Sequence, residues 1–111
     1  MRRLEYRAPR KTAAFPIEFS TDSGTTQGSC RDVSETGIRA EFDCRSPLGA
    51  TGVLTLRHPA HKLTLLARIT HAEPSHVGFS FVFAVPEERG AAKRFVALVT
   101  EWTGAQGLRF R

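Results

Sequence analysis

Five basic residues crowd the first eleven positions of this 111-residue chain: Arg2, Arg3, Arg7, Arg10 and Lys11. One acidic residue, Glu5, stands among them, so the segment has a net charge of +4. An arginine side chain presents a planar fork of donors that can bind a phosphate, or the O6 and N7 edge of a guanine, through two hydrogen bonds. Because Pro9 interrupts any helix, we expect residues 1–14 to form an arm that can hold a multivalent anion.

A second stretch, "DVSETG" at residues 32–37, sets Asp32, Ser34 and Gly37 at Asp-x-Ser-x-x-Gly spacing. An ionised Asp32 can accept hydrogen bonds from N1–H and N2–H₂ of a guanine, and Ser34 can donate to a phosphate or brace the turn. Gly37 can adopt a positive φ and let a ligand come close to the backbone. The same pattern also occurs in plain turns, where Asp and Ser bond their own backbone. The turn therefore indicates a ligand only in combination with the arginine arm.

Common catalytic and metal-binding patterns do not occur in the sequence. His58 and His61 form an H-x-x-H, but a proline lies between them and no third ligand accompanies them. His71 ends an alternating run, where we expect a histidine at the edge of the core. The chain has no glycine-rich phosphate loop and no G-x-S-x-G motif, and its two cysteines, Cys30 and Cys44, are expected to be free thiols. We predict that the protein is not an enzyme and uses no metal and no cofactor.

The positive charge is confined to the ends of the chain. Residues 12–102 contain nine basic and ten acidic side chains, and the last nine residues add a charge of +2. A protein that binds DNA or RNA usually spreads its basic residues over one face of the folded body, so this distribution favours a small polyanion instead. No apolar run approaches the roughly 20 residues of a membrane span, and the first residues lack the apolar segment of a signal peptide. We expect a cytoplasmic protein without a membrane span.

The residues between the arm and position 84 show the period-two alternation of half-buried strands. Phe15, Ile17 and Phe19 point to one side in "FPIEFS", and "GIRAEFDC" and "VGFSFVFA" alternate in the same way. We expect six short strands at 15–20, 29–33, 37–44, 53–58, 62–72 and 77–84. A polar turn is expected at 22–28, between the first two of these strands.

From Pro86 the apolar period becomes helical. Phe95, Leu98, Val99 and Trp102 fall at i, i+3, i+4 and i+7, so they form one stripe. Pro86 suits a first helical turn, and Gly104 is expected to end the helix. We predict a helix over about 86–103 and a tail at 104–111. Six strands and one terminal helix favour a mostly β fold, a small antiparallel β-barrel over residues 15–103 with the helix packed against it.

With these residues in place, the chain resembles the PilZ domain, the bacterial receptor module for cyclic di-GMP. The resemblance extends from about Arg7 to Trp102. "DVSETGIRAEFD" matches the family's [DN]-x-S-x-x-G motif at Asp32, Ser34 and Gly37. "HVGFSFVF" resembles its late strand, with Gly78 before Phe79. The resemblance implies a six-stranded barrel with a C-terminal helix and a site that binds cyclic di-GMP.

The arm matches the family's R-x-x-x-R motif less closely. In "YRAPRKTAAFPIEF", the spacing to the first strand makes Arg10 the last arginine and Arg7 the one before it, with Tyr6 where a further arginine is common. In a second register, Arg3 and Arg7 satisfy R-x-x-x-R, but the arm is then too long. The resemblance implies that Arg7, Arg10, Asp32, Ser34 and Gly37 bind the ligand, with Arg3 and Tyr6 as additional contacts.

Three functions are compatible with these residues. The favoured one is a cyclic di-GMP receptor in bacterial second-messenger signalling, for instance in motility, whose arm folds over the nucleotide and switches an unidentified protein partner. The alternative is a PilZ-like adaptor that has lost the nucleotide and acts through protein contacts. A barrel that binds single-stranded nucleic acid would expose aromatic residues on a strand face. The phenylalanines here alternate inward, so no DNA or RNA partner is expected.

Overall fold

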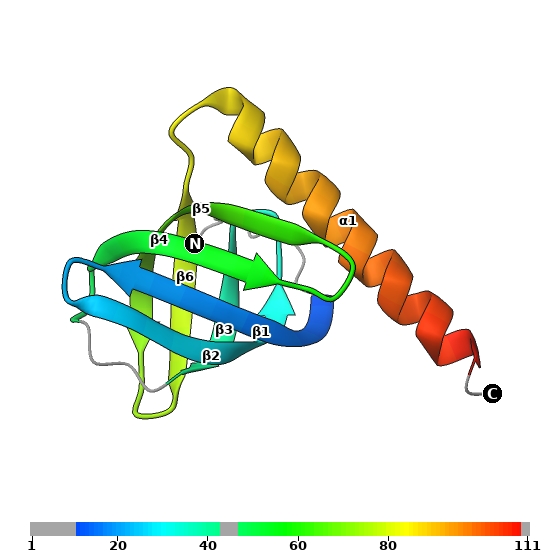
Figure 1. Ribbon diagram of the computed structural model, residues 1–111, viewed down its shortest axis with the longest axis horizontal. Coiled ribbons are helices and arrows are strands. Elements are labelled where there is room, and N and C mark those ends of the chain that lie inside the picture. The colour runs from blue at the N-terminus through cyan, green and yellow to red at the C-terminus, as the bar shows by residue number, and fades with distance from the viewer. Residues whose placement is uncertain (1–10, 43–46, 110–111) are drawn as a thin grey trace, which may run out of the picture.

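The computed structural model describes the backbone of residues 11–42 and 47–109, and the side chains of 12–42 and 47–99. Six antiparallel strands form a closed barrel in the order β1-β2-β3-β6-β5-β4, and one helix packs against it (Figure 1). The six-stranded barrel and its C-terminal helix are confirmed. The elements are β1 (Lys11–Thr21), β2 (Gly24–Val33), β3 (Gly37–Phe42), β4 (Thr51–Arg57), β5 (Lys62–Ala72), β6 (His76–Val82) and α1 (Pro86–Arg109).

The first hairpin differs from the expectation. The polar stretch expected as a turn at 22–28 is mostly strand, because β2 begins at Gly24 and pairs with β1 from Thr21↔Gly24 onward. Only Asp22 and Ser23 remain as the connection, and Gly24 takes a φ of 132° directly after them. This end of β2 is exposed on both faces, so it lacks the alternation that marks half-buried strands. β1 begins at Lys11, earlier than the expected start at Phe15.

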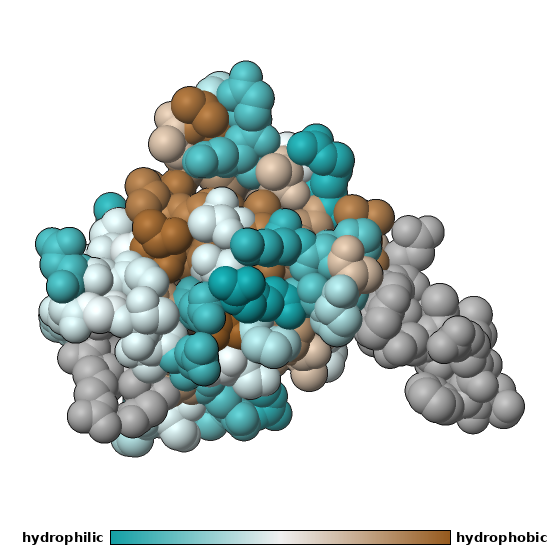
Figure 2. Space-filling model, viewed as in Figure 1, coloured by the Kyte–Doolittle hydropathy of each residue, from teal (hydrophilic) through white to brown (hydrophobic). Residues whose placement is uncertain are grey.

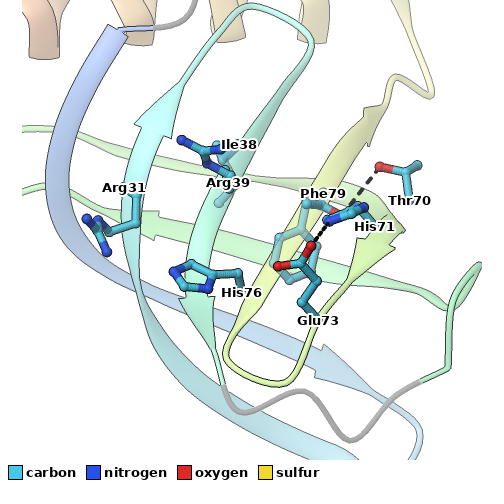
Figure 3. Close-up of a pocket in the computed structure, with 9 residues that line it drawn as sticks. Arg31, Ile38, Arg39, Thr70, His71, Glu73, His76 and Phe79 are labelled. Carbon is cyan, nitrogen blue, oxygen red and sulfur yellow. Dashed lines mark hydrogen bonds and ion pairs between the residues drawn. The ribbon is translucent and has the colours of Figure 1, made fainter.

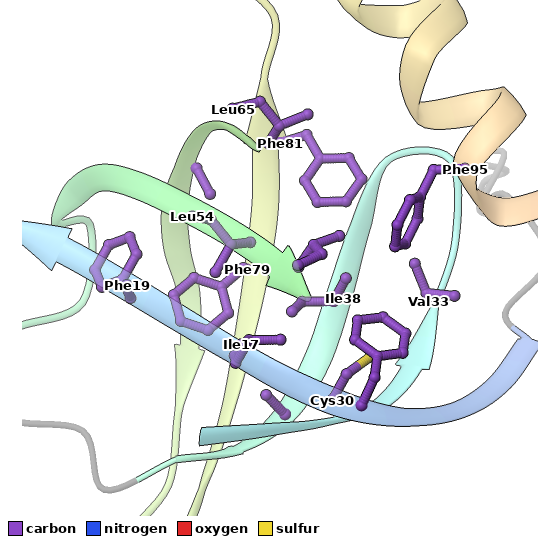
Figure 4. Close-up of a cluster of buried hydrophobic side chains, with 14 of the residues drawn as sticks. Ile17, Phe19, Cys30, Val33, Ile38, Leu54, Leu65, Phe79, Phe81 and Phe95 are labelled. Atoms are coloured by element: carbon purple, nitrogen blue, oxygen red, sulfur yellow. The ribbon is translucent and has the colours of Figure 1, made fainter. Parts of the chain in front are cut away.

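The inward faces of the strands form the core of the barrel. Phe19 and Phe79 lie close together in this core (Figure 4). With Phe42 they make a triangle of ring contacts with centroid separations of 4.8–6.2 Å. Such edge-to-face and tilted pairs are each worth about 0.5–1.5 kcal/mol beyond the burial of their area. Cys30 lies in the same core as a free thiol, and burial, together with the nearby Asp32 charge, raises its pKa to about 12. The thiol is therefore part of the packing.

The helix begins at Pro86, as predicted, and its first turn carries Glu87 and Glu88. The Glu88 carboxylate accepts a hydrogen bond from the Ala84 N–H at 2.7 Å, and acidic side chains stabilise the positive end of a helix. The C-terminal end differs from the expectation, since α1 continues through Gly104 to Arg109. A glycine commonly ends a helix by adopting a positive φ. Among the described glycines only Gly24 and Gly49 do so.

The buried side of α1 also differs from the predicted stripe. Ala92, Phe95, Val96 and Val99 are buried, whereas Leu98 is 40% exposed. Trp102 lies outside the residues whose side chains are described. Phe95 packs against Phe15 of β1, with ring centroids 5.7 Å apart in an edge-to-face arrangement. The helix is therefore turned toward Ala92 and Val96, and the small Ala92 lets it come close to the barrel.

The outside of the barrel carries a small apolar area. Val53 of β4 and Leu66 of β5 are cross-strand neighbours, and each is about 40% exposed. Figure 2 shows a hydrophobic area beside β4 on the face that is turned to the viewer. Within the described residues, no helix is both long enough and apolar enough to cross a membrane.

Candidate functional site

The turn between β2 and β3 is held together by Ser34. Its hydroxyl accepts a hydrogen bond from the Thr36 N–H at 3.2 Å and lies 3.3 Å from the Gly37 carbonyl oxygen, to which it donates. The Ser34 N–H donates to the same carbonyl at 2.8 Å. The Thr36 carbonyl then accepts a hydrogen bond from the Phe81 N–H of β6 at 2.8 Å. Ser34 is only 5% exposed and braces the turn from within, while Thr36 ties the turn to β6.

Gly37 is required by close packing and not by an unusual backbone angle. It pairs with Ser80 in the β3–β6 ladder, and a Cβ added to it would lie 2.2 Å from the Phe79 carbonyl oxygen. The expected positive φ is not found, because among described glycines only Gly24 and Gly49 have one. The turn therefore lies directly against β6.

A β-bulge in β2 places Asp32 outside the barrel wall. The register shifts between Cys30 and Asp32, so that Val33 faces the core opposite Ile38 while Asp32 lies opposite Arg39. Bulges re-aim side chains in this way, and they are frequent beside functional sites. The Asp32 carboxylate and the Arg39 guanidinium form an ion pair of 2.9 Å. Asp32 is nevertheless only 8% exposed, so the carboxylate is sheltered although it lies on the outer face.

A groove of about 840 Å³ runs across the outer faces of β2, β3, β6 and β5 (Figure 3). In the strand register, Asp32, Arg39, Gly78 and His71 follow one another across these four strands. Gly78 has no side chain, so the middle of this row is open. The groove is lined by Arg31, Ile38, Arg39, Thr70, His71, Glu73, His76, Gly78 and Phe79.

Polar side chains from both sides face the groove. Arg31 and Arg39 stand on one side with His76, and His71 and Glu73 stand on the other (Figure 3). Arg31 forms an ion pair with Glu41, and His71 Nε2 lies 3.1 Å from a Glu73 carboxylate oxygen. The side chains of Arg39 and His71 are 57% and 61% exposed. Exposed guanidinium, imidazole and carboxylate groups around one open surface can bind an anion or the edges and faces of an aromatic base.

The residues expected to bind a ligand are placed as follows. Asp32 lies at the edge of the groove beside Arg39, and Ser34 and Gly37 shape the turn next to it. The remaining expected contacts lie outside the described residues: Arg3, Tyr6, Arg7 and Arg10.

Sequence reasoning missed the side chains on the strands that line the groove. Arg39 could have been found from the alternation of "GIRAEF", which directs it outward. His71 could not, because the second bulge, between Ile69 and His71, reverses the face on which it is expected. The prediction of a histidine at the core edge is therefore wrong, since the side chain is largely exposed.

His58 and His61, the H-x-x-H pair of the sequence, have a packing role and do not line the groove. His58 is buried, its ring makes an edge contact with Phe15 at 5.8 Å, and it stacks on His61 at 5.6 Å. His58 Nδ1 accepts a hydrogen bond from the Ala60 N–H at 3.1 Å. Burial, with a smaller effect of His61, lowers the pKa of His58. Within the described residues, no three His, Cys, Asp or Glu side chains are grouped to hold a metal ion.

Comparisons with known proteins agree with this architecture. The PilZ domain family model matches residues 1–98 of the chain. The PilZ domain of YcgR from Escherichia coli, solved with c-di-GMP, superposes with a TM-score of 0.77 at 12% identity, covering 94% of this chain and 98% of that one. The PilZ domain of CeSA from a cellulose-synthesizing bacterium gives a TM-score of 0.67 at 22% identity, with coverage of 80% and 95%.

A third structure, the Bacillus subtilis inhibitor of motility MotI, gives a TM-score of 0.67 at 14% identity. It covers all of this chain, which corresponds to 56% of MotI. At these identities the structures show a common fold. No curated protein sequence matches the chain.

Proposed function

The chain belongs to the PilZ domain family, and from this premise we propose that it is a receptor for cyclic di-GMP. The observation that carries the proposal is the groove lined by Arg31 and Arg39, the second of which is ion-paired with Asp32. PilZ domains are nucleotide-binding receptor or adaptor modules and not enzymes. The YcgR domain with the same fold was solved with this nucleotide.

The ligand chemistry fits the residues on both sides of the groove. Cyclic di-GMP has two phosphates, which suit the guanidinium groups of Arg7 and Arg10, with Arg3 as a further donor. Its guanines present N1–H and N2–H₂ donors, which suit the Asp32 carboxylate. In this structure Asp32 is paired with Arg39. Ligand binding would therefore use an acceptor that Arg39 already orients.

The affinity that such contacts provide can be estimated. Hydrogen bonds to charged groups contribute about 1.5–3 kcal/mol each, and micromolar binding needs about 8 kcal/mol. Four or five good contacts are therefore sufficient, after the cost of ordering the arm. The arm has Tyr6 at a position where an arginine is common, so the affinity depends more strongly on each remaining charged contact.

We further propose that the arm closes over the nucleotide in the cytoplasm and changes the surface that a protein partner meets. A role in motility is one candidate, since MotI, which shares the fold, is named an inhibitor of motility. Tyr6 stands where a further arginine is common in the family. This difference favours one alternative: an adaptor that acts through protein contacts without the nucleotide.

Calorimetric titration with cyclic di-GMP at moderate salt, with GMP as control ligand, tests the proposal. We expect saturable micromolar or tighter binding to the wild type, and losses of about tenfold or more for Arg10→Ala and Asp32→Ala. The matched control is Arg57→Ala, which removes a strand arginine that is ion-paired with Glu18 outside the groove. No binding by the wild type would favour the adaptor. Equal binding by Asp32→Ala and Arg57→Ala would contradict the assigned role of Asp32.

A further inference from the structure

Three aliphatic side chains lie next to one another on the outer face of β4, β5 and β6, and we call them the apolar patch. Val53 is paired with Leu66, and Leu66 is paired with Val82. Val53 and Leu66 are 41% and 38% exposed, and Val82 is half-buried. The hydrophobic area beside β4 is visible in Figure 2. None of these three residues lines the groove, so the patch is a separate surface.

A hollow of about 470 Å³ lies beside the patch, at the end of the β1–β2 hairpin. Val53, Pro47 and Ala50 give it an apolar wall, and serine and threonine hydroxyls complete the lining. Asp22 is the one charged residue of this lining. Lysine and arginine lay their aliphatic stems along apolar surface while the charged head stays in a polar setting. The hollow therefore suits a basic side chain whose head reaches the Asp22 carboxylate.

An arginine stands on the other side of β4. Arg68 of β5 is paired with Thr51 of β4, and Asp22 comes two residues after Ser20, the β1 partner of Val53. Neighbouring strands lie about 4.8 Å apart, so the backbones at Asp22 and Arg68 are roughly 10 Å apart, one on each side of β4. Within the part of the chain that the structure describes, neither residue forms an ion pair. Both charges can therefore pair with groups of a partner.

The size and the charges of this surface select the class of partner. A stable dimer buries about 800 Å² per subunit, which three partly exposed aliphatic side chains do not provide. The net charge of +5 also opposes self-association. Nucleic acids and anionic lipids favour clustered basic residues, whereas here a carboxylate lies across one strand from the arginine. A protein segment can present both charges around an apolar side chain.

We propose that the apolar patch, the hollow and Arg68 form a docking site for an extended segment of a partner protein. The segment presents three side chains on one face: a basic one that enters the hollow to Asp22, an apolar one that covers Val53 and Leu66, and an acidic one that pairs with Arg68. Residues i, i+2 and i+4 of an extended chain share a face and span about 13 Å, which the long side chains match to the surface.

This inference deepens the proposed function, because it rests on the protein partner that the function assigns. It does not depend on the nucleotide, since the residues of the docking site do not line the groove. The same surface would serve a receptor and an adaptor.

The probe is a capped peptide, Lys-Thr-Leu-Thr-Glu, titrated into the ¹⁵N-labelled full chain. We expect the amide resonances of Asp22, Val53, Leu66 and Arg68 to shift saturably, with a Kd of about 1–10 mM. A peptide with serine in place of leucine should bind about fivefold more weakly or worse, because the apolar contact is lost. Peptides with two lysines or with two glutamates should each bind more weakly, because each loses one ion pair and gains one repulsion.

Variants of the protein locate the contacts. Leu66→Ser should weaken binding of the probe about fivefold or more. The matched control is Leu98→Ser, which removes a leucine that is 40% exposed on α1 outside the patch, and it should bind as the wild type does. Asp22→Lys should reverse the preference, so that Glu-Thr-Leu-Thr-Glu binds more tightly than the probe. Arg68→Glu should likewise prefer Lys-Thr-Leu-Thr-Lys.

The outcomes separate this proposal from the receptor. If no amide at the patch shifts, or if Leu66→Ser binds the probe as Leu98→Ser does, the docking site is overturned. Two further results would also overturn it: a dimer in sedimentation that Leu66→Ser dissociates, or binding to phosphatidylglycerol vesicles that Leu66→Ser abolishes. Far-UV circular dichroism of each variant excludes loss of folding as the cause.

Every variant is also titrated with cyclic di-GMP, and each should bind it as the wild type does. Binding of the nucleotide without binding of the peptide leaves the receptor proposal standing and overturns the docking site. Binding of the peptide by a wild type that does not bind the nucleotide supports the docking site and contradicts the receptor.

Discussion

Gly37→Ala is the substitution whose effect follows most directly from the packing of β3 against β6. The added Cβ would lie 2.2 Å from the Phe79 carbonyl oxygen, whereas carbon–oxygen contacts between strands are usually about 3.3–3.6 Å. The β3 and β6 backbones must therefore separate by roughly 1 Å at this point. A neighbour that consists of backbone cannot rotate away, so the strain is shared by the turn that Ser34 braces.

The magnitude can be worked out from three contributions. Overpacking costs about 1–3 kcal/mol, and the loss of one hydrogen bond in the turn or ladder costs about 1 kcal/mol. Alanine also reduces the conformational freedom of the unfolded chain, which stabilises the folded variant by about 0.4–1 kcal/mol. The net destabilisation is about 1–3.5 kcal/mol. At roughly 4 °C per kcal/mol for a domain of this size, Tm should fall by about 4–14 °C.

The assay is thermal unfolding by circular dichroism, with urea unfolding as a second measure of the free energy. The matched control is Gly78→Ala, whose Cβ would lie 3.2 Å from the side chain of the exposed His71. The nearest atom is the His71 Cβ, which has to give by only a few tenths of an ångström, so we expect a smaller loss than for Gly37→Ala, about 1 kcal/mol or less. If Gly37→Ala melts at the temperature of the wild type or of Gly78→Ala, the packing argument for Gly37 is refuted. Ligand binding by Gly37→Ala is then measured well below its Tm, which separates any effect on the site from loss of folding.

Three further predictions concern the helix, the core thiol and the arm. Phe95→Ala should destabilise the fold by about 3–5 kcal/mol, because the buried ring packs against Phe15; a loss under 1 kcal/mol in urea unfolding would mean that α1 is not docked as described. In a Cys44→Ser background, Cys30 should resist iodoacetamide at pH 8.5 until urea unfolds the chain, since its pKa is raised to about 12 and the thiolate is the reactive form; rapid alkylation of the native protein would contradict this burial. Tyr6→Arg should tighten cyclic di-GMP binding by about tenfold, and an unchanged Kd in calorimetry would show that this position does not contact the ligand.

The strands and the core were readable from local patterns. Phe15, Ile17 and Phe19 alternate with polar residues, and all three are buried. The period of two is a property of the extended chain itself, so it could be read without knowing the partner strands. The change to a helical period at Pro86 was equally local, and it located the start of α1.

Features that depend on contacts between elements were predicted less well. The start of β2 is exposed on both sides, so only its pairing with β1 shows that it is a strand. Leu98 and Val96 are both compatible with a stripe that includes Phe95, and the choice between them depends on how α1 is turned against the barrel.

The groove shows the same division between the sequence and the tertiary structure. The sequence by itself determined that Asp32, Ser34 and Gly37 stand in one turn, because their spacing is short and the turn chemistry is local. Only the tertiary structure decided that Arg39, Gly78 and His71 meet in one row, because three strands far apart in the chain had to be paired in a definite register. The two bulges set which face Asp32 and His71 occupy, and a shift of one residue would turn either side chain to the opposite face of the barrel wall.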